Sequence, residues 1–377
     1  MSSKIKVVHV VEAMLGGIRQ HVIDIIENLD QEKYELYLIY SDKRADKAFW
    51  DEKEKLESCA KLILCSEMQR ELGLHDIKAY RIIKCHLNNI RPDIVHCHSS
   101  KGGILGRLAA KRCRVKKIIY TPNAYAFETP DISAIKKLIY ISAERFLSRH
   151  ATSRTINVSK GEMSLAREYK LDKVEKFTLI YNGIPDIELP SKEELRQELG
   201  LTPNVFYVGV TARCARQKDP MTFLRIADKV INSCEDVEFL YIGDGEMMDQ
   251  MKEYISEHGI EKKVHLLGFR NDACRLVGAL DIYLSTALYE GLPYSVIEAM
   301  RAGVSIVATD TIGNNELVVN GINGILFGVG DVEKGVEIIK EQIDRGIIKG
   351  KKSREVFEND YSLKVMISNL NKVYQNE

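Results

Sequence analysis

The sequence predicts an α/β protein made of two doubly wound domains, each with a parallel sheet covered by helices on both faces. The chain has 377 residues, which is long for one core and usual for two α/β domains of roughly 150–200 residues each. Short runs rich in Val and Ile alternate with amphipathic stretches from one end to the other. Strands that are apolar on both faces and joined by helices form parallel sheets, and two successive series predict two domains.

The expected elements follow from the period of the apolar residues. In the first half, strands are expected at 4–10, 34–40, 93–97, 117–121, 152–157 and 177–180, with helices between them, for example at 18–29, 75–90, 102–113 and 133–150. In the second half, strands are expected at 205–211, 237–242, 264–267, 281–285 and 304–308, again separated by helices such as 219–232 and 292–302.

These elements divide the chain into an N-terminal domain (1–182) and a C-terminal domain (183–357). The linker is expected to begin at Asn182-Gly183 and to continue through the charged stretch 186–200, because Gly and Pro interrupt the pattern there. Residues 358–377 carry apolar side chains at helical spacing. We expect a closing helix there that packs back toward the N-terminal domain.

Composition favours a cytoplasmic protein. Eight cysteines are scattered without a Cys-x-x-Cys pair, as expected for a reduced chain with neither a disulfide framework nor a structural zinc. The N-terminus is too short and too polar for a signal peptide, and no apolar run reaches the ~18 residues of a membrane span. Any membrane contact is therefore expected to be peripheral.

One stretch is strongly basic although the whole chain has no net charge. Residues 78–117 hold eleven Lys and Arg side chains and a single acid, Asp93. This stretch is either an ordinary solvated face or a surface for an anionic membrane or a lipid-diphosphate acceptor. Nucleic acid is disfavoured, because aromatic residues are not interleaved with the charges.

The most informative motif is the segment Ser285–Met300, which reads STALYEGLPYSVIEAM. A predicted strand runs into a loop, and Pro293 suits the first turn of the helix that follows. Gly291 allows a ligand to approach the backbone closely, and the helix N-terminus favours an anion. Glu290 before the helix and Glu298 within it are therefore placed to address different parts of one extended ligand.

Two further loops follow predicted strands. Arg213 and Lys218 come after strand 205–211, where they are placed to bind a diphosphate, although an ordinary basic loop has the same composition. Gly16-Gly17 follows strand 4–10, and adjacent glycines at such a turn suit either a phosphate or simply a tight turn.

Together these motifs resemble the retaining glycosyltransferase family four, of GT-B fold, over essentially the whole chain. The resemblance rests on a Glu-x7-Glu element, an Arg followed five residues later by Lys, the N-terminal Gly-Gly, a late Gly-x-x-Glu turn, the linker Asn-Gly and a Gly-Asp-Gly turn. The residues are Glu290, Glu298, Arg213, Lys218, Gly16, Gly17, Gly313, Glu316, Asn182, Gly183, Gly243, Asp244 and Gly245. It implies two Rossmann-like domains that face each other across a cleft.

The resemblance also implies roles. Glu290 would contact the donor sugar, Glu298 would hold the ribose, and Arg213 and Lys218 would neutralise the leaving diphosphate. The remaining donor-binding residues would be Gly16, Gly17, Gly243, Gly268, Phe269, Arg270, Gly291, Leu292 and Pro293. Fixed cations and a helix terminus can stabilise a leaving diphosphate without a metal, so no metal and no cofactor are expected.

One position departs from the family pattern. A histidine often follows Thr-Pro in the loop after strand 117–121, whereas this chain has Asn123. Asparagine can position a sugar hydroxyl but cannot titrate, so a histidine base is in doubt here. His98, Asn123 and Tyr125 are the candidate acceptor contacts, and Asn123 also joins Glu290, Arg213 and Lys218 as a candidate catalytic residue. His96 and His98 share a strand face, but no third ligand is evident in the sequence, which disfavours a metal site.

The sequence therefore predicts a hexosyl- or N-acetylhexosaminyltransferase that moves a sugar from a nucleotide-sugar with retention of the anomeric configuration. UDP is the expected nucleotide, because it is the most frequent one in the family that the chain resembles. The acceptor would be a glycan or a polyprenyl-diphosphate-linked glycan of a bacterial cell-surface polysaccharide. Two alternatives stay open: a nucleotide-sugar epimerase of similar build, and a non-catalytic protein that binds nucleotide or carbohydrate.

Overall fold

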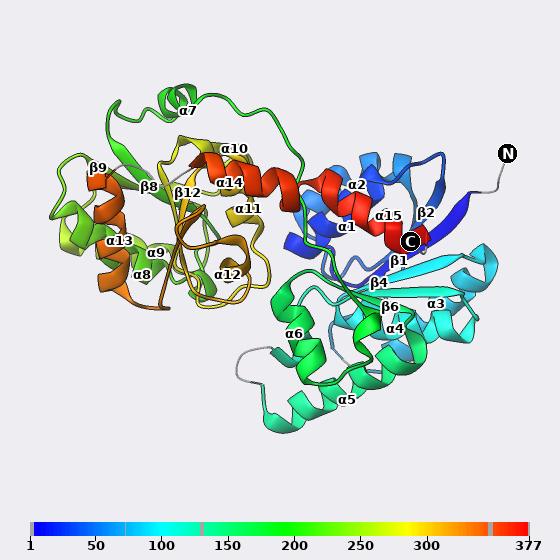
Figure 1. Ribbon diagram of the computed structural model, residues 1–377. Coiled ribbons are helices and arrows are strands. Elements are labelled where there is room, and N and C mark those ends of the chain that lie inside the picture. The colour runs from blue at the N-terminus through cyan, green and yellow to red at the C-terminus, as the bar shows by residue number, and fades with distance from the viewer. Residues whose placement is uncertain (1–3, 72, 129–131, 346–349, 376–377) are drawn as a thin grey trace. The chain divides into compact units, whose positions relative to one another are not determined.

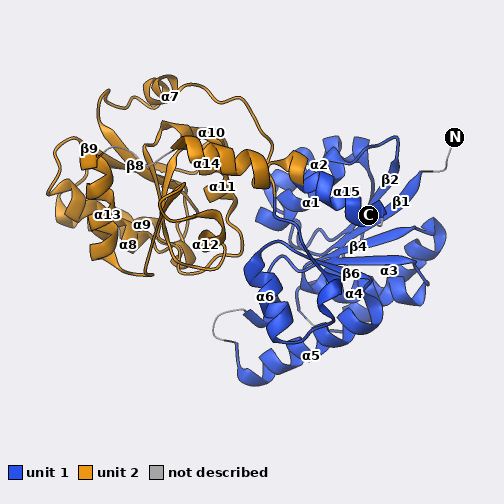
Figure 2. Ribbon diagram, in the orientation of Figure 1, with its two compact units in different colours: residues 1–182, 366–377 blue, residues 183–365 orange. Residues whose placement is uncertain are grey.

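The computed structural model describes residues 4–71, 73–128, 132–345 and 350–375, and the chain divides into two compact units (Figures 1 and 2). Unit 1 comprises Met1–Asn182 with Met366–Glu377, and unit 2 comprises Gly183–Val365. Each unit contains one parallel sheet with helices packed on it. The predicted α/β class with two parallel-sheet domains is confirmed.

Unit 1 has a seven-stranded sheet in the order β3-β2-β1-β4-β5-β6-β7. The strands are β1 (Ile5–Val11), β2 (Tyr34–Tyr40), β3 (Lys61–Leu64), β4 (Ile94–His98), β5 (Lys117–Thr121), β6 (Arg154–Asn157) and β7 (Phe177–Leu179). The helices are α1 (Gly16–Asn28), α2 (Lys47–Cys59), α3 (His75–Ile90), α4 (Ser100–Arg112), α5 (Ala134–Ala151) and α6 (Lys160–Glu168), with short turns η1 (Ala126–Glu128) and η2 (Val174–Lys176). The order of strand addition reverses between β1 and β4, which defines the switch point of this sheet.

The alternation of side chains along the central strands separates two different faces of this sheet. Val10 and Cys97 pair in register and face α4, where a Cβ atom on Gly106 would lie 2.6 Å from the Cys97 sulfur. The glycine thus lets α4 lie close on the sheet. His9 and His96, one position earlier, pair in register as well and lie on the other face.

Helices α4 and α5 are joined by a buried ion pair. The Arg107 guanidinium is fully buried and donates to Glu144 Oε2 at 2.8 Å and to the Gly103 carbonyl at 2.8 Å. It also lies over the Tyr120 ring, 3.7 Å from the centroid, and the Tyr120 hydroxyl donates to Glu144 Oε1 at 3.1 Å. Burial of a charge costs free energy unless it is paired in this way, so each member depends on the others.

The basic stretch 78–117 is less exposed than the sequence suggests. Arg107 is buried against Glu144, and Lys101 is buried and pairs with Asp76 at 2.7 Å. Both lie on α4, whose inner face packs on the sheet, so their charges do not belong to an open surface. No helix among the described residues has the length and the apolar character needed to cross a bilayer.

Unit 2 has a six-stranded sheet in the order β10-β9-β8-β11-β12-β13, with its switch point between β8 and β11. The strands are β8 (Phe206–Thr211), β9 (Val237–Ile242), β10 (Val264–Gly268), β11 (Ile282–Ser285), β12 (Ser305–Thr309) and β13 (Gly324–Phe327). The helices are α7 (Lys192–Glu198), α8 (Pro220–Ile231), α9 (Met248–His258), α10 (Ala273–Leu276), α11 (Tyr294–Arg301), α12 (Asn314–Leu317), α13 (Val332–Arg345) and α14 (Gly350–Val356), with turns η3 (Arg216–Lys218), η4 (Val277–Ala279) and the π-helical η5 (Phe357–Tyr361).

The structure departs from the sequence prediction at two edge strands and in the linker. The edge strands β3 and β13 are absent from the sequence prediction. Each has only four residues, and neither shows an alternation of buried and exposed side chains that would predict a strand. The charged stretch 186–200 contains the helix α7, which begins with a capping box between Ser191 and Glu194. Edge strands of four residues and a helix of seven residues are too short to show a clear period in the sequence.

The expected closing helix is α15 (Leu363–Gln375), and from Met366 onward it belongs to unit 1. Residues 376–377 lie outside the described part of the chain. The Lys117 ammonium donates to the carbonyls of Val373 and Tyr374 at 2.9 and 2.7 Å. A cation near the last carbonyls of a helix stabilises that end, so Lys117 anchors α15 on the sheet of unit 1.

Candidate active site

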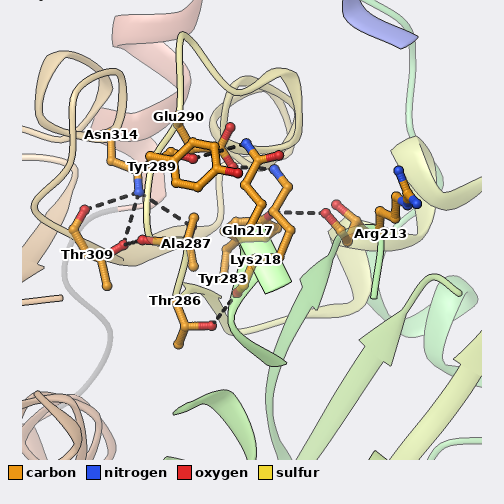
Figure 3. A network of polar contacts seen from close by, with 12 residues as sticks. Arg213, Gln217, Lys218, Tyr283, Thr286, Ala287, Tyr289, Glu290, Thr309 and Asn314 are labelled. Carbon is orange, nitrogen blue, oxygen red and sulfur yellow. Dashed lines mark hydrogen bonds and ion pairs between the residues drawn. The ribbon is translucent and has the colours of Figure 1, made fainter. Parts of the chain in front are cut away.

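In unit 2, two loops that are far apart in sequence meet at the switch point of the sheet. They follow β8 and β11, which are neighbours in the sheet, and ligands of open parallel sheets bind at this kind of position. The Leu288 amide donates to the Gln217 carbonyl at 2.8 Å, and the Gln217 side chain donates to the Tyr289 carbonyl at 3.0 Å. These bonds hold the two loops together (Figure 3).

The predicted residues Lys218 and Glu290 form an ion pair across these loops. Figure 3 shows their side chains directed toward one another. The Thr286 hydroxyl donates to the Lys218 carbonyl at 2.9 Å, which fixes the backbone that carries the lysine. A cation and a carboxylate are thus held at the carboxyl end of β8 and β11, beside the start of α11.

Helix α11 begins directly after this pair, with the buried Pro293 as its N-cap and the buried Leu292 before it. The first amides of a helix have no partner within the helix, and the helix dipole favours an anion there. Gly291 precedes this terminus and contacts the next loop closely: Gly313 has φ +90°, and a Cβ atom on it would lie 2.2 Å from the Gly291 carbonyl oxygen. Only glycine fits position 313, so this turn supports the backbone at Gly291.

Glu298 lies about one turn into α11. Burial raises the pKa of its carboxyl to about 7, against the weaker opposing effect of the nearby Arg301 charge. Because the neutral form is favoured by burial, Glu298 changes protonation close to neutral pH. A perturbed carboxyl at the switch point of a sheet is a candidate for ligand binding.

Arg213 does not join the Lys218–Glu290 pair. Its guanidinium is exposed and pairs with Glu246 at 2.9 Å, and in Figure 3 it points away from Lys218. Lys218 is the last residue of the turn η3, whereas Arg213 precedes that turn. The sequence expectation of two cations at one point is therefore not met in this structure: of Arg213 and Lys218, Lys218 alone contacts the β11 loop.

The other predicted donor residues of unit 2 lie at the same edge of the sheet. Gly243 and Gly268, at the ends of β9 and β10, form a bridge with each other. A Cβ atom on Gly243 would lie 1.9 Å from the Ala212 carbonyl oxygen, so this glycine is required by close backbone packing. Phe269 is 73% exposed, and Arg270 pairs with Asp272 through two bonds of 2.8 and 2.9 Å.

In unit 1, a cavity of about 650 Å³ opens at the carboxyl ends of β1, β4 and β5, again at the switch point. Its lining includes four cations and one carboxylate, together with the predicted Asn123 and Tyr125: Glu12, Arg44, Arg70, Lys101 and Lys136 are the charged members. The Arg44 guanidinium pairs with Glu12 at 3.0 Å. The cavity is therefore predominantly cationic.

The backbone at Asn123 is held in an unusual conformation. Asn123 and Ala124 have φ values of 52° and 83°, in the left-handed region that is costly for residues with a Cβ atom. The buried Glu162 carboxylate accepts from the Ala124 amide at 2.5 Å and from the Val158 amide at 3.0 Å, and so holds the loop. Tyr125 is buried, and its hydroxyl accepts from Asn157 at 3.1 Å.

The glycine pair at the start of α1 has a partner within the chain. The Gly16 amide donates to Asp46 Oδ2 at 3.0 Å, and Arg19 pairs with the same carboxylate at 3.3 Å. Asp46 also caps α2 by accepting from the Phe49 amide. A carboxylate thus lies where the sequence predicts a phosphate near Gly16 and Gly17, and a donor at this position would have to displace it.

His98 is fully buried in a stack of imidazoles. As expected, His96 and His98 share one face, with ring centroids 4.1 Å apart. The sequence interpretation found no third ligand, and this is wrong: β1 pairs with β4, so His9 joins them and contacts His98 at 3.0 Å between ring nitrogens. Burial lowers the pKa of His9 to about 3 and holds the pKa of His98 well below its ordinary value, so the stack is neutral.

Comparison with known proteins decides the family. Residues 15–186 match the sequence model described as Glycosyltransferase Family 4, and residues 191–361 match the model described as Glycosyl transferases group 1. The chain is a glycosyltransferase. The resemblance seen in the sequence is confirmed, and so is the prediction that the chain is an enzyme.

Relatives of known sequence support this assignment, and a solved structure shares the fold. The glycosyltransferase is 29% identical to the Escherichia coli UDP-Gal:α-D-GlcNAc-diphosphoundecaprenol α-1,3-galactosyltransferase, over 99% of this chain and 97% of the relative. It is 27% identical to a putative glycosyltransferase, EpsD of Bacillus subtilis, over 68% of each chain. In fold it resembles Anabaena HepE, solved in complex with UDP, with a TM-score of 0.81, 20% identity and complete coverage of both chains.

Several residues of the glycosyltransferase's candidate site were not found from the sequence. Arg44 and Arg70 come from loops without a recognisable motif, and Glu162 acts from the first turn of α6. Glu12 could have been found from the sequence, since it lies two residues beyond the end of the predicted strand 4–10. A polar residue at the end of a parallel strand is the signal that would have found it.

Proposed function

We propose that this glycosyltransferase transfers a sugar from a UDP-sugar to a polyprenyl-diphosphate-linked glycan, with retention and without a metal. The observation that carries the proposal is the Lys218–Glu290 pair beside the N-terminus of α11, with Glu298 one turn further along. A cation and a helix terminus at one point suit a diphosphate, and carboxylates on either side suit the hydroxyls of ribose and sugar. The name of the E. coli relative gives UDP-Gal as the donor and α-D-GlcNAc-diphosphoundecaprenol as the acceptor. HepE was solved in complex with UDP.

In the proposed reaction, the bond between the sugar C1 and the β-phosphate oxygen breaks as the acceptor oxygen bonds to C1 on the same face. The acceptor proton passes to the departing phosphate oxygen, so no basic side chain is needed. This agrees with Asn123, which cannot titrate, at the position where the family pattern often has histidine. Lys218 and the α11 terminus would stabilise the charge that develops on the leaving diphosphate.

The remaining predicted residues have supporting roles in this proposal. Arg213 would have to leave Glu246 and swing toward the diphosphate. Because both side chains are exposed, at 74% and 54%, their ion pair contributes little and opposes that movement only weakly. Phe269 is exposed beside Gly268 and would face the base.

The acceptor would be held by unit 1, in the cavity that contains Asn123. A membrane-bound acceptor also requires contact with a bilayer, and the exposed cations of 78–117 suit an anionic membrane at the cytoplasmic face. This contact would be electrostatic and would weaken with added salt.

The direct test is a transfer assay with UDP-galactose, UDP-glucose and UDP-N-acetylglucosamine and a GlcNAc-diphospholipid acceptor. We expect transfer from one of these donors, an α-linked product by NMR, and the same rate in EDTA. A β-linked product contradicts retention, and a rate lost in EDTA and restored by Mg²⁺ or Mn²⁺ contradicts metal independence. Conversion of the donor without acceptor would indicate an epimerase, and UDP binding without turnover would indicate a binding protein.

A further inference from the structure

Helix α5 of unit 1 exposes an apolar face to solvent. Ile135, Leu138, Ile139 and Phe146 are 75%, 65%, 57% and 58% exposed. Their spacing places them along one side of the helix, because residues three, four and eleven positions apart share a face. Exposed apolar residues are ordinary when scattered, but a contiguous stripe of large ones marks a surface for an apolar partner.

The neighbouring face of the same helix lines the cationic cavity. Lys136 and Tyr140, one turn apart, belong to the cavity lining together with Ile132 and Ser133, which directly precede α5. Each residue advances about 100° around a helix, so Lys136 lies roughly a quarter turn from Ile135. The apolar stripe therefore runs along the edge of the cavity.

The charges of the cavity converge on one region. Arg44, Lys101 and Arg70 all act to lower the pKa of the Glu12 carboxyl, although burial raises it overall. Glu12 compensates part of the charge through its pair with Arg44, and Asp76 compensates Lys101. A volume of about 650 Å³ exceeds the needs of one phosphate. The cavity thus suits an extended ligand that carries more than one negative charge.

We propose that this cavity and the apolar face of α5 form one seat for a membrane-held polyprenyl diphosphate, with the diphosphate at Arg70 and Lys136 and with Ile135, Leu138 and Ile139 in the bilayer surface. The inference rests on the proposed function and adds that the enzyme recognises the diphosphate and the membrane-held lipid of the acceptor. Charge complementarity selects the diphosphate. The apolar stripe selects a lipid source for it, because a soluble diphosphate needs no exposed apolar helix beside its site.

The experiment compares two acceptors in the same transfer assay: GlcNAc-diphosphopolyprenol in zwitterionic vesicles, and water-soluble GlcNAc-diphosphate with a short alkyl chain. The variant Ile135→Ser/Leu138→Ser/Ile139→Ser is expected to lose at least about tenfold in kcat/KM on vesicles and to match wild type on the soluble acceptor. Its control is Ile322→Ser/Val329→Ser, which removes exposed apolar side chains from unit 2 and is expected to leave both activities unchanged.

The cations are tested by Lys136→Ala and Arg70→Gln, which are expected to raise KM about tenfold for both acceptors without changing the affinity for UDP-glucose. The matched control is Lys137→Ala, because Lys137 lies on the same turn but its ammonium is over the Tyr169 ring, 5.3 Å from the centroid, and outside the cavity lining. Equal KM values for the acceptors in Lys136→Ala and Lys137→Ala would contradict a diphosphate site at Lys136.

Vesicle sedimentation separates this inference from the proposed function. Wild type is expected to bind zwitterionic vesicles more tightly when they contain polyprenyl diphosphate. The α5 variant Ile135→Ser/Leu138→Ser/Ile139→Ser is expected to bind vesicles with and without polyprenyl diphosphate equally. Equal binding of both proteins would overturn the inference while transfer to the soluble acceptor still upholds the function. If the α5 variant and Lys136→Ala lose as much binding to phosphatidylglycerol vesicles without diphosphate as to diphosphate vesicles, the surface recognises lipid headgroups in general, which contradicts the seat.

Discussion

Replacement of Lys218 by alanine is expected to lower kcat of sugar transfer by about 10²–10³-fold, the usual effect of removing one fixed donor from a developing negative charge. Lys218 is 23% exposed and lies against Glu290, which is 8% exposed. In this sparsely hydrated setting a charge acts strongly on a leaving diphosphate. The measurement is kcat under saturating donor and acceptor.

The control is Lys229→Ala, which breaks the exposed pair of Lys229 with Glu333 in the same unit and is expected to leave kcat unchanged. Glu290→Gln should also reduce transfer strongly. The double variant should lose less than the product of the two single effects, because the two side chains act as one unit. A Lys218→Ala enzyme within threefold of wild type would show that the lysine does not stabilise the leaving group.

The second large effect concerns stability. Glu144→Ala leaves the Arg107 guanidinium buried without its carboxylate, and removal of one partner from a buried pair costs about 3–5 kcal/mol. Arg107 is fully buried and also bonds the Gly103 carbonyl, so it cannot turn to solvent without unpacking α4 from the sheet. We expect a lower denaturant midpoint for unit 1 in urea unfolding.

The comparison variant for this prediction is Glu341→Ala, which removes an exposed pair with Arg345 on α13. Exposed pairs contribute about 0–1 kcal/mol, so its midpoint should stay close to that of wild type. If the two variants unfold at the same urea concentration, the buried network does not stabilise unit 1. Since α4 and α5 both border the cationic cavity, Glu144→Ala should also weaken acceptor use.

The sequence was sufficient to predict the two parallel sheets, because their central strands are apolar runs such as Phe239–Ile242 and, apart from His9, Val7–Val11. It also placed Lys218 and Glu290 at strand ends. That the two side chains meet depends on β8 lying beside β11, a property of strand order that periodicity does not contain. The same holds for His9, which reaches His98 only because β1 pairs with β4.

The direction of side chains was beyond the sequence as well. The spacing of Arg213 and Lys218 suggested that both side chains bind one diphosphate. In the structure Lys218 ends the turn η3, and Arg213, which precedes that turn, forms an ion pair with Glu246 instead. Likewise, the pattern Gly16-Gly17 suggested an open phosphate site, while Asp46 arrives there from the loop before α2. In both cases a carboxylate from a distant segment of the chain occupies the group that was expected to bind phosphate. The roles of Arg213, Lys218, Gly16 and Gly17 in donor binding stay predictions.

The most direct test of the donor site is the affinity for UDP-glucose, measured by calorimetry at pH 8 and pH 6 in wild type and Glu298→Gln. The diphosphate of UDP-glucose does not titrate in this range, whereas the Glu298 carboxyl, with its pKa of about 7, would have to ionise to hold the ribose in the proposed donor site. Falling pH protonates it, so we expect wild type to bind about tenfold more weakly at pH 6 than at pH 8. Glu298→Gln should bind weakly and equally at both. Identical, pH-independent affinities in the two proteins would contradict a donor site on α11.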